Sequence, residues 1–200
     1  MNYLAHLFLS GKDNGLICGN FLADFIKNAE VAQLPEPVQL GVKLHRLIDT
    51  YTDSHPVMRE SNKVLHPYFH KYAPVVSDMY CDYLLGKHWD TFSSEALTDF
   101  LQRIYGQLMI GIDTMPDRIQ SRTKQMISHN WLQSYTTIQG LGYAFMRMTE
   151  RVNFPMDFSK APEILLENEL VLENYFLEFF PNLLTEVQSF IEANLTTNQP

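Results

Sequence analysis

Cysteine is scarce in this chain of 200 residues, which contains Cys18 and Cys81 and no others. Two cysteines so far apart exclude a disulfide-dense secreted fold and match no cysteine-based zinc motif. Long apolar runs are also missing, because no segment approaches the roughly 18 residues that a membrane-spanning helix requires. The start of the chain lacks the basic segment that opens a signal peptide. We therefore expect a cytoplasmic protein with reduced thiols.

Strand patterns and the common catalytic motifs are missing too. The chain has no sustained alternation of apolar and polar residues, and its apolar residues instead recur at helical spacing along most of its length. It has no P-loop, no dinucleotide-binding fingerprint, no Gly-x-Ser-x-Gly elbow and no His-Glu-x-x-His motif. These absences exclude the commonest nucleotide-binding, serine hydrolase and zinc protease functions.

The apolar spacing predicts an all-α fold, with residues 1–200 forming a single compact multi-helix domain. A hydrophobic content of 46% is sufficient for a core of that size. We expect the site to come mainly from residues 1–90, a loop at 153–161, and C-terminal packing helices within 162–195. Prolines at six positions suit the first turns of helices. The predicted helices cover residues 2–10, 16–29, 36–53, 56–72, 74–87, 93–112, 116–134, 137–151, 162–179 and 181–195.

Acidic residues outnumber basic ones, which gives a formal net charge of −8. The excess lies at the C-terminal end, because residues 150–200 hold nine acidic and two basic side chains. Residues 1–87 are nearly balanced, with nine acids and eight bases. Several of those nine acids are candidate metal ligands, whose charge a cation would offset. The remaining surface there would then be basic and would attract an anionic substrate.

The most informative segment runs from residue 44 to residue 54, where His45, Asp49 and Asp53 follow one another at intervals of four. Helical residues turn by about 100° each, so a step of four shifts a side chain by only about 40° and the three groups share one stripe. An imidazole and two carboxylates together suit a hard divalent cation. Apolar neighbours place this stripe at the edge of the core. Without a metal, the same pattern is an ordinary polar helix face.

Three more acids and one histidine lie in apolar surroundings. Asp78 and Asp82 repeat the four-residue spacing, and two such carboxylates repel each other unless a cation or a shared proton lies between them. Asp24 stands in an otherwise apolar segment and needs a partner if it is buried. His6 is placed similarly, although a lone histidine on an apolar helix is more often a hydrogen-bonded core residue than a metal ligand.

Five short blocks, in this order and spacing, resemble the acyl carrier protein phosphodiesterase family. The resemblance is strong over residues 1–90 and weaker toward the C-terminus. The blocks are Met1–Leu7, Gly19–Phe25, Leu44–Asp53 with Arg59 just beyond, Asp78–Leu84, and His88-Trp89.

This resemblance implies an all-helical, HD-domain-like core that hydrolyses a phosphodiester with the help of a metal. The bond links 4′-phosphopantetheine to a serine of holo acyl carrier protein, and its hydrolysis releases the apo-protein. The implied metal is manganese, with magnesium or iron(II) as alternatives. The chain departs from the standard HD pattern because it has no His-Asp dipeptide. The metal-ligand candidates are His6, Asp24, His45, Asp49, Asp78 and Asp82.

Other residues are expected to act on the substrate. Asp53 is a candidate general base, and His88 a candidate for protonating the departing serine. Arg46 and Lys43 would meet charge on the phosphoryl oxygens. Acyl carrier protein is strongly acidic, so Lys43, Arg46 and Arg59 are candidates for binding it. We expect neither nucleic acid nor a membrane as a partner.

Two alternatives remain open from the sequence. One keeps the metal site but gives an HD-like phosphohydrolase of a nucleotide or another small phosphoester. The other is a non-catalytic helical binding module, in which the acids form ion pairs and no metal binds.

Overall fold

The computed structural model describes residues 1–150 and 156–195, and these contain helices and no strand. The predicted all-α fold is therefore confirmed. The HD-like arrangement of its core stays a prediction. In chain order the α-helices and the two 3-10 helices, η1 and η2, are α1 (Tyr3–Leu9), α2 (Asn14–Leu22), α3 (Asn28–Val31), α4 (Glu36–Ser54), α5 (Pro56–Phe69), η1 (His70–Tyr72), α6 (Ala73–Lys87), α7 (Trp89–Phe92), α8 (Leu97–Ile110), η2 (Ile112–Thr114), α9 (Asp117–Ser128), α10 (Trp131–Tyr135), α11 (Ile138–Thr149), α12 (Ala161–Glu167) and α13 (Glu169–Leu195).

One predicted helix break is in the wrong place. The chain passes through Pro181 inside α13 instead of starting a helix there. A proline inside a helix costs about 3 kcal/mol, but Phe180 and Leu183 beside it are fully buried, and each such side chain contributes about 1.5–3 kcal/mol. The real break is at Asn168, whose side-chain amide donates to the carbonyl of Ile164 and so competes with the helix.

Two other predicted helices are interrupted. The segment 116–134 divides into α9 and α10 because Asn130 adopts the left-handed conformation, with φ 49° and ψ 51°. The segment 16–29 ends as a helix at Leu22, and the short α3 follows. The remaining predicted helices are present with shifted ends. The predicted helix end at residue 151 and the first part of the predicted 153–161 loop lie outside the described residues.

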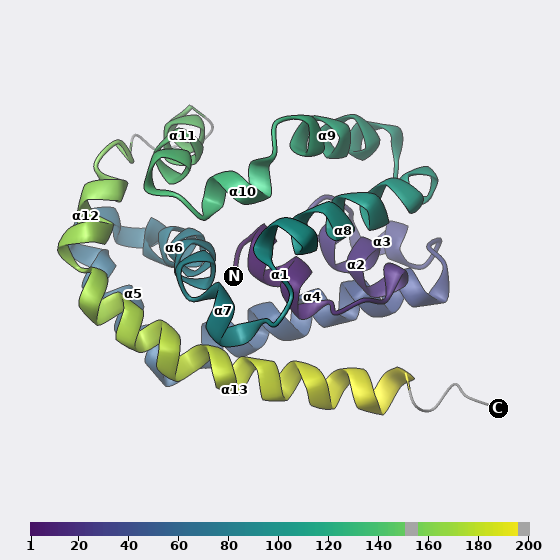
Figure 1. Ribbon diagram of the computed structural model, residues 1–200, viewed down its shortest axis with the longest axis horizontal. Coiled ribbons are helices and arrows are strands. Elements are labelled where there is room, and N and C mark those ends of the chain that lie inside the picture. The colour runs from purple at the N-terminus through teal and green to yellow at the C-terminus, as the bar shows by residue number, and fades with distance from the viewer. Residues whose placement is uncertain (151–155, 196–200) are drawn as a thin grey trace.

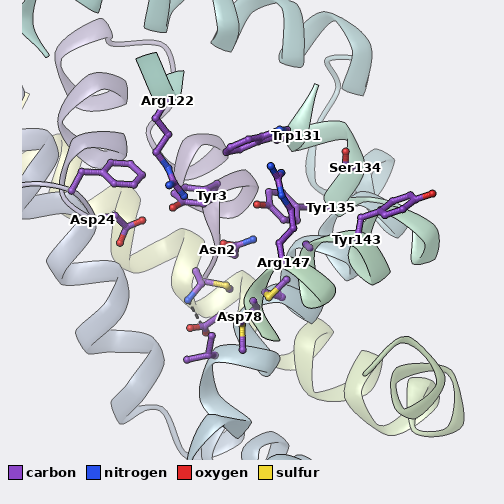
Figure 2. A pocket seen from close by; sticks show the side chains of 17 residues that line it. Asn2, Tyr3, Asp24, Asp78, Arg122, Trp131, Ser134, Tyr135, Tyr143 and Arg147 are labelled. Carbon is purple, nitrogen blue, oxygen red and sulfur yellow. Dashed lines mark hydrogen bonds and ion pairs between the residues drawn. The ribbon is translucent and has the colours of Figure 1, made fainter. Parts of the chain in front are cut away.

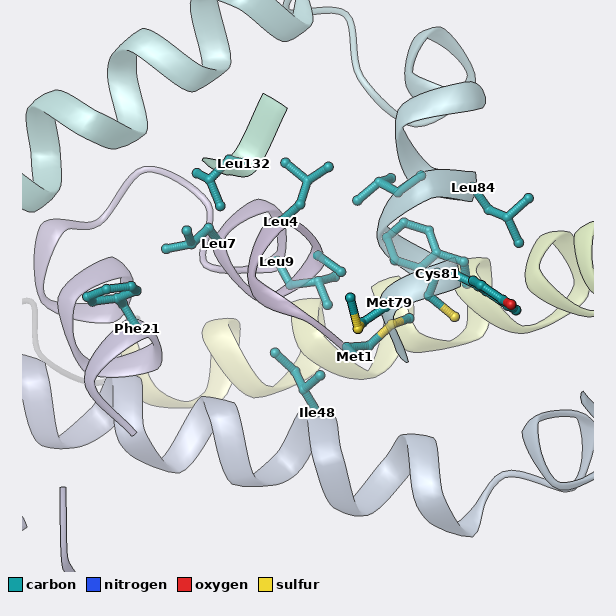
Figure 3. Close-up of a cluster of buried hydrophobic side chains, with 14 of the residues drawn as sticks. Met1, Leu4, Leu7, Leu9, Phe21, Ile48, Met79, Cys81, Leu84 and Leu132 are labelled. Carbon is teal, nitrogen blue, oxygen red and sulfur yellow. The ribbon is translucent and has the colours of Figure 1, made fainter. Parts of the chain in front are cut away.

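The N-terminal helix α1 lies at the centre of the molecule, as Figure 1 shows, and it contacts α2, α6 and α10. Its apolar side chains are buried, with Leu4 and Leu7 fully inaccessible to solvent. Figure 3 shows these side chains meeting Ile48 of α4, Met79 of α6 and Leu132 of α10. The core therefore joins segments from most of the chain around α1. This arrangement also fixes the position of His6, which lies on α1.

The long helices α4 and α13 pack side by side along one side of the molecule (Figure 1). In the described residues no helix is long and apolar enough to span a membrane.

Candidate metal centre and the adjoining pocket

Helices α2 and α4 approach each other closely because both carry glycine at their crossing point. A Cβ atom on Gly19 would lie 1.9 Å from the carbonyl oxygen of Val38 and 2.7 Å from the Cα of Gly41. No other residue fits there unless the helices separate. The close approach brings Asn20, the residue after Gly19, against His45 of α4.

Asn20 orients two buried histidine rings. Its side-chain NH2 group donates to the carbonyl oxygen of His6 and to the hydroxyl of Ser10, each at 2.9 Å. The amide oxygen is therefore the atom that faces the imidazoles, and it accepts from Nδ1 of His6 at 2.8 Å and from Nδ1 of His45 at 3.0 Å. The two rings stack with their centroids 4.1 Å apart. With Nδ1 protonated on both rings, both Nε2 atoms point away from Asn20.

Both Nε2 atoms point at the same carboxylate. Nε2 of His6 lies 3.1 Å from one oxygen of Asp49, and Nε2 of His45 lies 3.1 Å from the other. Asp24, two residues beyond the end of α2, places an oxygen 3.4 Å from Nε2 of His45. Two neutral imidazoles would face these oxygens with bare lone pairs, so a proton or a metal ion must lie between them.

The charges of these groups fit that geometry. Burial lowers the pKa of His6, although its hydrogen bond with Asp49 opposes this. For His45 burial also acts to lower the pKa, but hydrogen bonds to Asp24 and Asp49 outweigh it and raise the pKa to about 9. The two histidines hold the pKa of Asp49 well below its usual range, against the effect of its own burial. In the metal-free protein, His45 is therefore protonated, and its positive charge lies where a metal ion would bind.

The donor set fits a divalent metal ion. One ligand atom from each of His6, His45 and Asp49 can be chosen so that all lie within 4.8 Å of one another. Neighbouring ligands of an octahedral ion with bonds of about 2.1 Å lie about 3 Å apart, which is close to the observed 3.1 Å separations. Metal-bound histidines also commonly donate their second ring nitrogen to a fixed acceptor, as both do here to Asn20. Asp24 lies beside this group, 3.4 Å from Nε2 of His45, but is not one of the three residues whose ligand atoms lie mutually close.

Asp78 and Asp53 lie apart from this group, though nearby. Asp78 accepts a hydrogen bond from the amino group of Met1 at 2.8 Å, and it raises the pKa of that amino group despite the opposing effect of burial. Asp53 is exposed one helical turn beyond Asp49. Partial burial and the nearby charge of Asp78 raise its pKa. The structure therefore does not bring Asp78 directly into the histidine cluster.

The structure places Asp82 against the backbone of α1, and its predicted role as a metal ligand stays a prediction. It is fully buried, and its two oxygens accept from the backbone N–H groups of Leu4 and Ala5 at 2.8 and 3.0 Å. These N–H groups belong to the first turn of α1 and have no partner within that helix. Burial raises the pKa of Asp82 to about 7, although the two hydrogen bonds oppose it. Asp82 thus anchors α1, which carries His6.

The residues predicted to act on substrate are spread more widely. Lys43, Arg46 and Arg59 are exposed on α4 and α5, and Arg46 donates to the side chain of Asn28 at 2.6 Å. His88 follows α6 and bonds to Glu173 of α13. It is not among the residues around the pocket described next.

A pocket of about 440 Å³ adjoins the cluster, and Asp24 belongs to both. Figure 2 shows Asp24, Asp78, Arg122, Trp131 and Arg147 around this pocket, with Arg122 on the same side as Asp24. The arginines come from α9 and α11, and Trp131 from α10. None of the three was predicted from the sequence, because they belong to three separate helices and follow no spacing rule. Asn20 was not predicted either, and its only signal is a polar side chain inside an apolar helix.

The described residues form an all-helical fold in which two oriented histidines and an adjacent carboxylate make a possible metal site. Comparison with known proteins identifies it further. The family model for acyl carrier protein phosphodiesterase matches residues 1–183. The chain belongs to this family, which confirms the resemblance seen in its sequence.

Curated relatives are similar to this chain over nearly their whole length. A Yersinia pestis protein named acyl carrier protein phosphodiesterase is 28% identical over 189 residues, which cover 94% of this chain and 98% of that protein. Proteins with the same name from Enterobacter sp. (strain 638) and Serratia proteamaculans (strain 568) are 27% and 26% identical, with the same coverage. No solved structure matches the chain.

Proposed function

We propose that this protein is a metal-dependent acyl carrier protein phosphodiesterase. It hydrolyses the phosphodiester between 4′-phosphopantetheine and a serine of holo acyl carrier protein, and it releases the apo-protein. The observation that carries the proposal is the convergence of His6, His45 and Asp49 in a chain of this family. Manganese is the proposed metal, and the cytoplasm the proposed location.

His6, His45, Asp49 and Asp24 would hold the metal. Bound there, a divalent ion supplies Lewis-acid stabilisation of phosphoryl charge and makes a water molecule more acidic. Asn20 keeps both Nε2 atoms directed at the ion. This orientation is built into the fold before any ligand binds, so little has to be reorganised on binding.

Asp53 is the proposed general base. It is exposed one turn from Asp49, and its raised pKa makes it a better proton acceptor than an ordinary aspartate. Asp78 accepts a hydrogen bond from the amino group of Met1 through Oδ1, and its role as a metal ligand stays a prediction. His88 has Glu173 as its partner, and this contact gives no support to a role in protonating the serine.

Lys43, Arg46 and Arg59 are the proposed contacts for the carrier protein. All three are exposed. Lys43 and Arg46 lie on either side of His45 in sequence, so an acidic partner bound there would be close to the metal ligands. The acidic C-terminal helix α13 would repel the same partner.

Mass spectrometry of holo acyl carrier protein, incubated with the protein with and without manganese, tests this function. We expect loss of the phosphopantetheine mass only with manganese. Asp49→Asn should abolish the loss, and Asp90→Asn, at an exposed site on α7, should leave it intact. An unchanged holo mass together with manganese-dependent hydrolysis of nucleotides would favour the small-phosphoester alternative. Absence of both bound metal and activity would favour the binding module.

A further inference from the structure

The pocket beside the metal centre has two guanidinium groups against one aromatic ring. The Cζ atom of Arg147 lies 5.1 Å from the centre of the Trp131 ring, and that of Arg122 lies 5.7 Å from it. Arg122 also lies 5.1 Å from the Phe25 ring. Within residues 1–150 and 156–195, neither arginine forms an ion pair with a carboxylate. Two such cations on one pocket wall repel each other, and an anionic ligand would relieve that repulsion.

The fold holds Trp131 in place. Asn130, just before it, adopts a left-handed conformation that non-glycine residues rarely adopt. Tyr105 of α8 donates to the Asn130 side chain at 2.8 Å and accepts from the backbone N–H of Leu132 at 3.1 Å. One hydroxyl group therefore bonds on both sides of Trp131 and fixes the turn that presents it.

The neighbouring helix, α11, is also held in a fixed position. A Cβ atom on Gly140 would lie 2.0 Å from the carbonyl oxygen of Ser134, so α11 packs directly on α10. This contact sets the position of α11, and with it Arg147, relative to Trp131. The fold therefore holds Trp131 and the backbone of α11 in place.

The pocket is lined by side chains of both charges. Asp24 and Asp78 line it together with the two arginines, and Arg122 packs on Phe25, the residue after Asp24 (Figure 2). Asp24 also lies 3.4 Å from Nε2 of His45, so one residue of the pocket lining contacts the histidine cluster. A volume of about 440 Å³ is in the range for a ligand of roughly twenty non-hydrogen atoms, which is the size of phosphopantetheine.

We propose that the wall formed by Arg122, Trp131 and Arg147 binds the phosphopantetheine arm and makes the enzyme specific for it. This inference rests on the proposed function. The guanidinium groups donate to the phosphate and amide carbonyl oxygens of the arm, and the Trp131 ring packs against its hydrocarbon part. The carrier protein itself stays outside the pocket.

Calorimetric titration of the metal-free protein with 4′-phosphopantetheine, in the presence of a chelator, tests this role without depending on catalysis. We expect Arg122→Gln and Arg147→Gln each to weaken binding about tenfold, since each removes a charge-assisted hydrogen bond. Lys124→Gln is the matched control, because Lys124 is an exposed cation on the same helix as Arg122. It should bind as the unaltered protein does. Arg147 is also exposed, so its replacement should leave the fold intact.

Two further measurements sharpen the test. Trp89 is buried and Trp131 is half-buried, so Trp131→Phe should remove most of the fluorescence change that phosphopantetheine causes. With holo acyl carrier protein and manganese, both arginine variants should raise KM more than they lower kcat, because they act on binding of the arm.

The proposal is overturned if both arginine variants bind phosphopantetheine as Lys124→Gln does, or if adenosine monophosphate binds this wall more tightly than phosphopantetheine. Hydrolysis of holo acyl carrier protein that persists alongside the first result would leave the proposed function standing and refute only the pocket assignment. Arginine-dependent binding of phosphopantetheine without any hydrolysis would support the pocket assignment and refute the proposed function.

Discussion

Replacing Asn20 by alanine should disable the metal centre while leaving every proposed ligand in place. Asn20 accepts from both imidazole Nδ1 groups and donates to the His6 carbonyl oxygen and to Ser10. The Ser10 hydroxyl still bonds to the His6 carbonyl oxygen after the change. The two imidazole N–H groups, by contrast, lose their acceptor.

The magnitude follows from those two orphaned donors. Each buried unsatisfied group costs about 1–3 kcal/mol, so the protein should lose about 2–6 kcal/mol of stability, toward the lower end if water fills the vacated space. A neutral histidine can also move its proton from Nδ1 to Nε2, where it donates to Asp49 and no longer offers a lone pair to a metal. Loss of such an orienting partner typically weakens metal binding about 10- to 100-fold.

The assay is manganese affinity by calorimetry, paired with urea unfolding in the presence of a chelator. Asn14→Ala is the matched control, since Asn14 lies on the same helix and donates to the backbone and side-chain oxygens of Gln107. It should lose stability and retain manganese affinity. If Asn20→Ala also retained the affinity of the unaltered protein, the orientation argument would be refuted.

Three further outcomes follow from the structure. Gly19→Ala should destabilise the protein by about 3 kcal/mol or more, because the new Cβ meets the Val38 carbonyl oxygen; a fall in Tm of less than roughly 6 °C would contradict this. Asp82→Asn should cost about 1–3 kcal/mol in urea unfolding and keep manganese affinity; loss of affinity without loss of stability would instead make Asp82 a ligand. The pKa of His45, raised to about 9, predicts that manganese affinity increases about tenfold per pH unit from pH 6.5 to 9, because the metal displaces its proton. For the same reason the metal-free protein should keep the stability from this charged pair below pH 6.5 and lose it as the pH rises through about 9. Affinity independent of pH in calorimetry would contradict that linkage.

The part of the site that lies on one helix could be predicted from sequence. His45 and Asp49 are four residues apart on α4, and both meet at the cluster, because helical periodicity alone determines which side chains share a face. Their role as metal ligands stays a proposal. The same spacing rule could not predict that Asp82 accepts hydrogen bonds from the backbone of α1, because that contact depends on a neighbouring helix.

Contacts between distant segments could not be predicted. His6 reaches the cluster only because α1 is buried in the centre of the fold, and Asp24 because α2 and α4 cross at glycines. The continuous helix through Pro181 has the same kind of cause, since buried neighbours outweigh a local preference. The pocket wall around Trp131 could not be predicted either, because its residues come from three separate helices.

We propose that one metal centre, held by His6, His45 and Asp49, performs the hydrolysis. The most direct test is to titrate manganese into metal-free protein and to measure bound metal and formation of apo acyl carrier protein in the same samples. We expect activity to rise in proportion to the occupancy of one site per chain, and Asp49→Asn to lose both together. Full activity in the metal-free protein, or in Asp49→Asn without bound metal, would contradict the claim.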